Sequence, residues 1–117
     1  MRVGTMLETE VTVHGRVSTI QIRGRYELTS VNYVENVFRE QLYADFDIIA
    51  FDLKNLHYID SSGIGSLIRC TNLARKQNIK TVFYNLGPDI DSVFRLSKLD
   101  TLIDIISEDT FRQKYLA

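Results

Sequence analysis

Asp60-Ser61-Ser62-Gly63-Ile64-Gly65, residues 60–65, is the most informative stretch of the sequence. It follows a short apolar segment, Leu56 to Ile59, and precedes a stretch in which apolar residues recur at helical spacing. The two serines therefore lie at a predicted helix N-terminus, where unpaired backbone N–H groups favour negative charge. A hydroxyl placed there can act as a nucleophile or accept a phosphate group.

Upstream of this motif, two alternating segments predict a β-hairpin. They span Glu8 to Val13 and Val17 to Arg23, with His14-Gly15-Arg16 between them, and we expect Gly24 to end the second strand. A helix capped by Thr29 or Ser30 should follow and run to about Tyr43.

The rest of the chain alternates between predicted strands and helices. The apolar run within Asp47 to Leu53 is typical of a central parallel strand covered on both faces. The helix after the motif should stop near Asn78 in a left-handed conformation. We then expect a strand at Lys80 to Asn85, a helix from Gly87-Pro88-Asp89, a last strand at Leu102 to Ile106, and a final helix capped by Ser107.

This order predicts an α/β sandwich, a single domain over residues 1–117 with about five strands, mostly parallel after the first, and four helices. In such sheets, functional sites gather at the carboxyl ends of the strands. Two loops should meet there, Gly24 to Thr29 and Tyr58 to Gly65.

Composition narrows the classes of function. The 14 basic and 15 acidic residues give a net charge of -1, and no basic block suggests nucleic-acid binding. No apolar run approaches the ~18 residues of a membrane helix, and residues 1–8 lack the apolar core of a signal peptide. The one cysteine, Cys70, suits a reducing compartment and should be at least half-buried. We expect a cytoplasmic protein without membrane or direct nucleic-acid partners.

The residues offer little for catalysis. Ser61 and Ser62 lack the glycines of a hydrolase elbow, and the only candidate bases are His14, in the hairpin turn, and His57, on the connecting segment before the motif. Neither a phosphate-binding loop nor a metal-ligand spacing is present, so we expect no catalytic residue, metal or cofactor.

Two further features of the motif region have alternative interpretations. The glycines, Gly65 above all, should serve a tight turn and close helix–sheet packing rather than a dinucleotide. Glu27 and Asp60 should lie on neighbouring loops, either as an acid–base pair or as capping and solvated acids, with Asp60 capping the helix directly.

The string Tyr58 to Gly65 closely resembles the signature of STAS domains, in particular of bacterial anti-sigma factor antagonists. Gly24 to Glu27 resembles that family's glycine-plus-acid loop, and Val93 to Asp100 its penultimate helix and turn. The resemblance covers nearly the whole chain. It implies a STAS-like sandwich, a mixed sheet with four or five helices, in agreement with the pattern above.

The resemblance also implies a role. Antagonists of this family bind an anti-sigma factor that is also a GHKL-type serine kinase, which releases a sigma factor. The kinase phosphorylates the serine after the aspartate, Ser61 here, and a PP2C-type phosphatase reverses this. The partner-binding residues implied are Glu27, Asp60, Ser62, Gly63, Ile64 and Gly65. The chain departs from the commonest pattern at Glu27, where many members have Asp, and at Ser66, where an apolar residue is frequent.

Several alternatives stay open at the level of sequence. Ser62 rather than Ser61 could accept the phosphate, because both lie at the same helix start. The chain could instead be an unphosphorylated scaffold or a subunit of a transporter or a stress-signalling complex. A small-molecule or nucleotide binder, with Glu27 and the Asp60 loop lining the site, is a third possibility.

Overall fold

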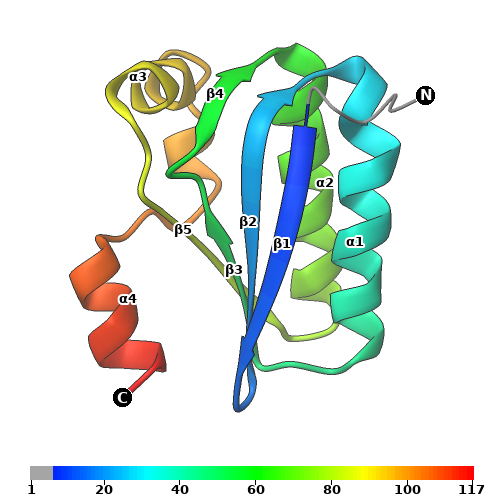
Figure 1. Cartoon of the computed structure of the whole chain (residues 1–117), viewed down its shortest axis with the longest axis vertical. Helices are drawn as coiled ribbons and strands as arrows, with labels where there is room; N and C mark the ends of the chain where they lie inside the picture. Colours follow the sequence, from blue (N-terminus) through cyan, green and yellow to red (C-terminus); the bar gives the residue numbers. More distant parts are fainter. Residues whose placement is uncertain (1–6) are drawn as a thin grey trace.

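The computed structural model describes residues 7–117, and its sheet begins with a β-hairpin (Figure 1). β1 (Leu7–His14) pairs antiparallel with β2 (Val17–Tyr26), and Gly15, at φ +58°, makes the turn between them. The hairpin prediction is confirmed. Residues 1–6, part of the segment without a signal-peptide pattern, lie outside the described residues.

The second strand changes partner along its length. β2 pairs in parallel with β3 (Ile48–Asp52) through residues 17–21 and with β4 (Leu56–Ile59) from Gly24 onward. The expectation that Gly24 ends this strand is wrong. Gly24 has φ +99°, which glycine adopts without strain, and its N–H donates to the Asn55 carbonyl at 2.9 Å, so the strand bends there and continues to Tyr26.

The sheet has five strands, but one of them is not the predicted one. β5 (Lys80–Tyr84) pairs in parallel with β3, which gives the order β1-β2-β3-β5 with β4 beside β2. Residues 102–106, expected as the last strand, form only a single bridge between Phe83 and Ile105. The Leu56–Ile59 segment is the fifth strand instead, because the outer half of β2 offers it a free edge.

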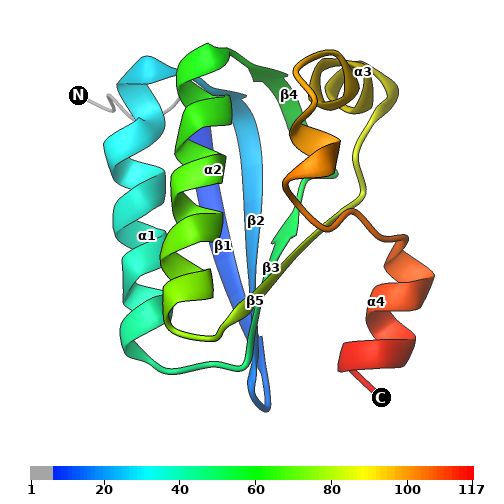
Figure 2. The ribbon, with the colours of Figure 1, turned by 180° about the vertical axis from the view of Figure 1, so that it is seen from behind.

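Four α-helices complete the fold, as the sequence predicts. Both α1 (Val31–Tyr43) and α2 (Ser61–Lys76) cover one face of the sheet, whereas α4 (Glu108–Tyr115) lies against the other (Figures 1 and 2). The last helix, α3 (Pro88–Leu96), packs beside β4. Two short 3-10 helices, η2 (Leu28–Ser30) and η3 (Leu99–Thr101), join these elements.

The core has two parts, one on each side of β3. The larger part, beneath α1 and α2, includes Ile49 and Phe51, and the smaller part, beneath α4, includes Ala50 and Phe111. Neighbouring side chains of β3 thus point to opposite faces. This confirms that the Asp47 to Leu53 run is a central strand covered on both faces.

Most predicted helix ends are confirmed. Asn78 is left-handed at φ +60°, Pro88 occupies the first turn of α3, and the Ser107 hydroxyl accepts the Thr110 N–H at 3.0 Å. Ser30 precedes α1, but its hydroxyl makes no capping bond to that helix and accepts the Glu27 N–H at 3.0 Å instead. Among residues 7–117, no helix is both long and apolar enough to cross a membrane.

Candidate functional site at the N-terminus of α2

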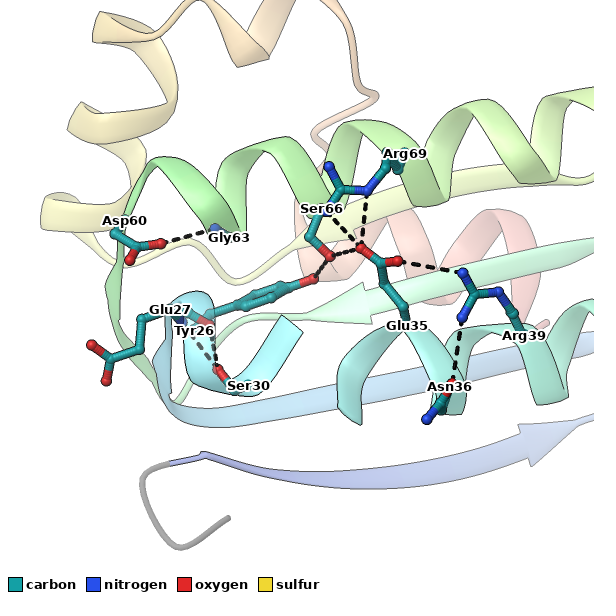
Figure 3. Close-up of polar contacts among 10 residues, drawn as sticks. All are labelled: Tyr26, Glu27, Ser30, Glu35, Asn36, Arg39, Asp60, Gly63, Ser66 and Arg69. Atoms are coloured by element: carbon teal, nitrogen blue, oxygen red, sulfur yellow. Dashed lines mark hydrogen bonds and ion pairs between the residues drawn. The ribbon is translucent and has the colours of Figure 1, made fainter. Parts of the chain in front are cut away.

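The carboxyl ends of β2 and β4 meet where α2 begins. These strands run in parallel, so their ends reach the same edge of the sheet. Asp60 follows β4 directly, and Tyr26 is the last residue of β2. The Asp60 N–H donates to the Tyr26 carbonyl at 3.2 Å. The predicted meeting of the two loops is thereby confirmed, and Figure 3 shows Glu27 and Asp60 at this shared end.

Asp60 caps α2. Its backbone is extended (φ -104°, ψ -176°), and its carboxylate accepts the Gly63 N–H at 2.9 Å, as Figure 3 shows. This confirms the predicted cap and satisfies one of the N–H groups that every helix start leaves unpaired. The N–H groups of Ser61 and Ser62 have no hydrogen-bond partner among residues 7–117, so the start of α2 keeps two donors for an anion.

The two serines differ in exposure. Ser61 is exposed, Ser62 is half-buried, and Gly63 is buried beneath them. Ile64 is half-buried and packs against the main core. The hydroxyl most open to a second protein is therefore that of Ser61.

Close packing requires a glycine at position 63 rather than at position 65. A Cβ at Gly63 would lie 2.5 Å from the Tyr26 carbonyl oxygen and 2.8 Å from Cγ1 of Ile59. A Cβ at Gly65 would meet only Nη1 of Arg69, at an ordinary 3.6 Å. The expectation that Gly65 serves close helix–sheet packing is wrong, because position 65 turns away from the ends of the strands.

Glu27 and Asp60 do not act on one another. Glu27 accepts a hydrogen bond from Nε of Arg25 at 3.1 Å, and that guanidinium lies 4.0 Å from the centre of the Tyr58 ring. The Asp60 carboxylate accepts the Gly63 N–H at the start of α2. Of the two interpretations of these acids, the geometry favours capping and ion pairing over an acid–base pair.

The two histidines lie elsewhere. His14 ends β1 and is exposed. His57, expected on a connecting segment, belongs to β4 and is exposed as well. Within residues 7–117, neither histidine forms a hydrogen bond with Ser61.

A buried polar network lies behind the site, and the sequence does not reveal it. The Tyr26 hydroxyl donates to the Ser66 hydroxyl, which in turn donates to Glu35 at 2.6 Å (Figure 3). Arg69 donates to the same Glu35 oxygen through Nη2 at 2.9 Å and Nε at 3.1 Å. On its other oxygen, Glu35 faces Arg39 at 3.5 Å. The network joins the end of β2 to α1 and α2.

The network sets the ionisation of its members. Burial raises the pKa of Glu35, but the hydrogen bonds from Ser66 and Arg69 and the nearby guanidinium charges outweigh burial, so its pKa is lowered overall. Burial raises the pKa of Tyr26 and raises that of Cys70 to about 12. Near neutral pH, Glu35 is therefore a charged acceptor beside a neutral phenol and a neutral thiol. Cys70 is buried, within its expected range.

The sequence model of the STAS domain matches residues 8–113. A STAS-domain containing protein of Pseudomonas aeruginosa is 25% identical over 91 residues, which are 78% of this chain and 89% of that protein.

Solved structures of low identity share the fold. An anti-sigma factor antagonist from Mycobacterium paratuberculosis superposes with a TM-score of 0.76 at 18% identity, over 85% of this chain and 84% of that one. The anti-sigma factor antagonist SpoIIAA in its unphosphorylated form superposes with a TM-score of 0.75 at 17% identity, over 91% of this chain and 95% of that one. The Bacillus SpoIIAA in its phosphorylated form superposes with a TM-score of 0.70 at 17% identity, over 92% of this chain and 98% of that one. With the family match over residues 8–113, the chain belongs to the STAS domain family.

Proposed function

We propose that this protein is an anti-sigma factor antagonist whose binding is switched off by phosphorylation of Ser61. The observation that carries the proposal is the geometry of the α2 start: an exposed serine hydroxyl at a helix N-terminus, next to an aspartate that caps the helix. The partner would be an anti-sigma factor of the GHKL serine-kinase type, and a PP2C-type phosphatase would reset the switch.

The local structure would tolerate the phosphate. A phosphoserine carries about -1.5 to -2 charges at neutral pH. The two N–H groups without partners, those of Ser61 and Ser62, and the positive end of the α2 dipole would stabilise this charge. The phosphorylated protein should therefore keep its fold, so the modification acts on the surface.

A bound partner would not tolerate the same charge. A surface packed over a neutral Ser61 would meet a dianion next to the Asp60 carboxylate. An unpaired charge at an interface costs several kcal/mol, and each ~1.4 kcal/mol is tenfold in affinity. Steric and electrostatic exclusion at one residue is enough to switch binding without a large conformational change.

The neighbourhood of Ser61 suits a docking surface. Leu28, on η2 next to the start of α2, is 71% exposed although it is a large apolar side chain. Together with the half-buried Ile64 and the exposed Tyr58, it supplies apolar area that a partner would bury. Glu27, Ser62, Gly63 and Gly65 complete the proposed partner-binding surface around Ser61 and Asp60.

Solved structures of similar proteins support the proposal. SpoIIAA has been solved in both an unphosphorylated and a phosphorylated form, and its fold is that of this chain. That likeness concerns the fold alone. The functional carry-over rests on the Tyr58 to Gly65 string and on the exposure of Ser61 over Ser62.

Phosphosite mapping tests the proposal. The protein would be incubated with ATP and the GHKL-type anti-sigma factor of its source cell, then analysed by mass spectrometry. We expect one phosphate, on Ser61, in the wild type and in Ser62→Ala, and none in Ser61→Ala. Phosphate on Ser62, or unchanged labelling of Ser61→Ala, would contradict the assignment of the acceptor.

Binding to the same kinase tests the switch itself. Ser61→Asn and Ser61→Asp are nearly equal in size but differ in charge. We expect Ser61→Asp to bind at least tenfold more weakly than Ser61→Asn. We also expect Leu28→Ala to bind more weakly than the control Leu102→Ala, because Leu102 is 52% exposed but lies away from the proposed surface. If the wild type fails to bind any such kinase from its own cell, the protein is a scaffold or subunit rather than an antagonist.

A further inference from the structure

A second candidate site lies beside the C-terminal half of α2. A cavity of about 500 Å³ opens between α2, the start of β5 and the segment that follows η3. Figure 2 shows the ribbon of α2 and β5 and the chain between α3 and α4, which reaches β5 at the bridge between Phe83 and Ile105. The size of the cavity is within the range of sites for small organic ligands. Rising ~1.5 Å per residue, α2 separates Thr71, on the cavity wall, from Ser61 by about 15 Å.

The cavity carries one uncompensated positive charge. Lys80 and Asp104, both on its wall, neutralise each other through a 3.0 Å ion pair. Arg75 also lines it, has no carboxylate partner among residues 7–117, and contacts only the Asn72 side-chain oxygen, at 3.3 Å. A free guanidinium is the group best suited to bidentate recognition of a phosphate or carboxylate.

The end of α2 does little to offset this charge. A helix C-terminus carries partial negative charge on carbonyls without partners. Here the Ala74 carbonyl accepts the N–H groups of Gln77 and Ile79, each at 2.9 Å, and the Arg75 carbonyl accepts that of Asn78 at 3.0 Å. These bonds partner two of the last four carbonyls of α2, which reduces the partial negative charge near Arg75.

Thr71 supplies an independent observation. It is 6% exposed and lines the cavity, and its hydroxyl is the one buried side-chain polar atom without a hydrogen-bond partner in the described range 7–117. A buried hydroxyl without a hydrogen-bond partner destabilises the folded state. An oxygen of a ligand bound in the cavity would give this hydroxyl its missing hydrogen-bond partner.

We propose that this cavity binds a small phosphate ester. Arg75 receives the phosphate, and the Thr71 hydroxyl donates to one of its oxygens. Leu102 and Ile103, two of the apolar residues of the wall, contact the organic group. The proposal is independent of the switch at Ser61, because none of these residues belongs to that surface.

Titration calorimetry of the full chain at constant ionic strength tests this, with inorganic phosphate and phenyl phosphate as probes. We expect saturable binding of both, tighter for phenyl phosphate because its ring buries apolar surface. Arg75→Gln should weaken phenyl phosphate binding about tenfold or more. Lys76→Gln, which removes a neighbouring exposed charge that does not line the cavity, should leave binding within twofold of wild type.

Thr71→Val separates binding from folding, because valine keeps the shape and removes the hydroxyl. We expect weaker binding of phenyl phosphate together with an unfolding free energy at least equal to wild type. Absence of saturable binding in the wild type, or equal effects of Arg75→Gln and Lys76→Gln, would overturn the site. Unchanged binding by Thr71→Val would overturn the role of its hydroxyl.

Discussion

The carbonyl oxygen of Tyr26 occupies the space that a side chain at Gly63 would need. A Cβ at Gly63 would lie 2.5 Å from that oxygen, which also accepts the Asp60 N–H at 3.2 Å. The first turn of α2 is therefore pressed against the end of β2, and this contact fixes where Ser61 emerges on the surface. The close approach of α2 to the end of β2 requires glycine at position 63, because any side chain there would collide with the Tyr26 carbonyl.

Gly63→Ala should destabilise the fold. The added methyl group meets backbone at the Tyr26 carbonyl, which cannot yield without moving the strand end, so we expect a loss of about 1–3 kcal/mol in unfolding free energy. Gly65→Ala is the matched control, because its methyl group meets only the Arg69 side chain at 3.6 Å. It should be neutral or stabilise α2 by about 0.5–1 kcal/mol. Urea denaturation measures both, and equal losses would contradict the close approach.

Asp60 should be replaceable in folding by any good capping residue. Asp60→Ala removes the acceptor of the Gly63 N–H and should cost about 0.5–2 kcal/mol in urea denaturation. Asp60→Asn keeps a capping oxygen and should remain within about 0.5 kcal/mol of wild type. A loss in Asp60→Asn as large as in Asp60→Ala would mean that its charge, rather than its cap, stabilises the helix start.

Local patterns account for most of what the sequence predicts correctly. The hairpin, the doubly covered β3, the Asp60 cap and the left-handed Asn78 each follow from residues within a few positions of one another. The meeting of the two loops follows from the rule for parallel strands, and the STAS assignment from the Tyr58 to Gly65 string.

The errors have a common physical origin in tertiary packing. Residues 102–106 look like a strand, but they meet the edge strand β5 only through the single bridge between Phe83 and Ile105. The roles of Gly63 and Gly65 depend on which residue of α2 faces the strand ends. The Tyr26–Ser66–Glu35 network joins residues up to 40 positions apart, and no local pattern indicates which partner each would find.

A double-mutant cycle should show that this network is coupled. Tyr26→Phe removes one donor, whereas Ser66→Ala leaves the Tyr26 hydroxyl and the Glu35 carboxylate each short of a partner. We expect Ser66→Ala to cost about 1–3 kcal/mol and Tyr26→Phe less. The double variant should lose clearly less than the sum of the two, by 0.5 kcal/mol or more. Additive losses measured by urea denaturation would mean that the bonds act independently.

Glu35 should make the protein less stable in acid. Its pKa is lowered in the folded state, because the hydrogen bonds of Ser66 and Arg69 outweigh the effect of burial, so its stabilisation is present above the unfolded pKa of about 4.3. It is lost as the pH falls through the folded pKa. Glu35→Gln should be less stable than wild type at pH 7, and the difference should shrink below about pH 4. The half-buried Glu108, whose pKa Arg112 lowers, titrates in both proteins and cancels from the difference. Urea denaturation of both proteins from pH 3 to 7 measures this, and a pH-independent difference would show that the charge of Glu35 does not stabilise the network.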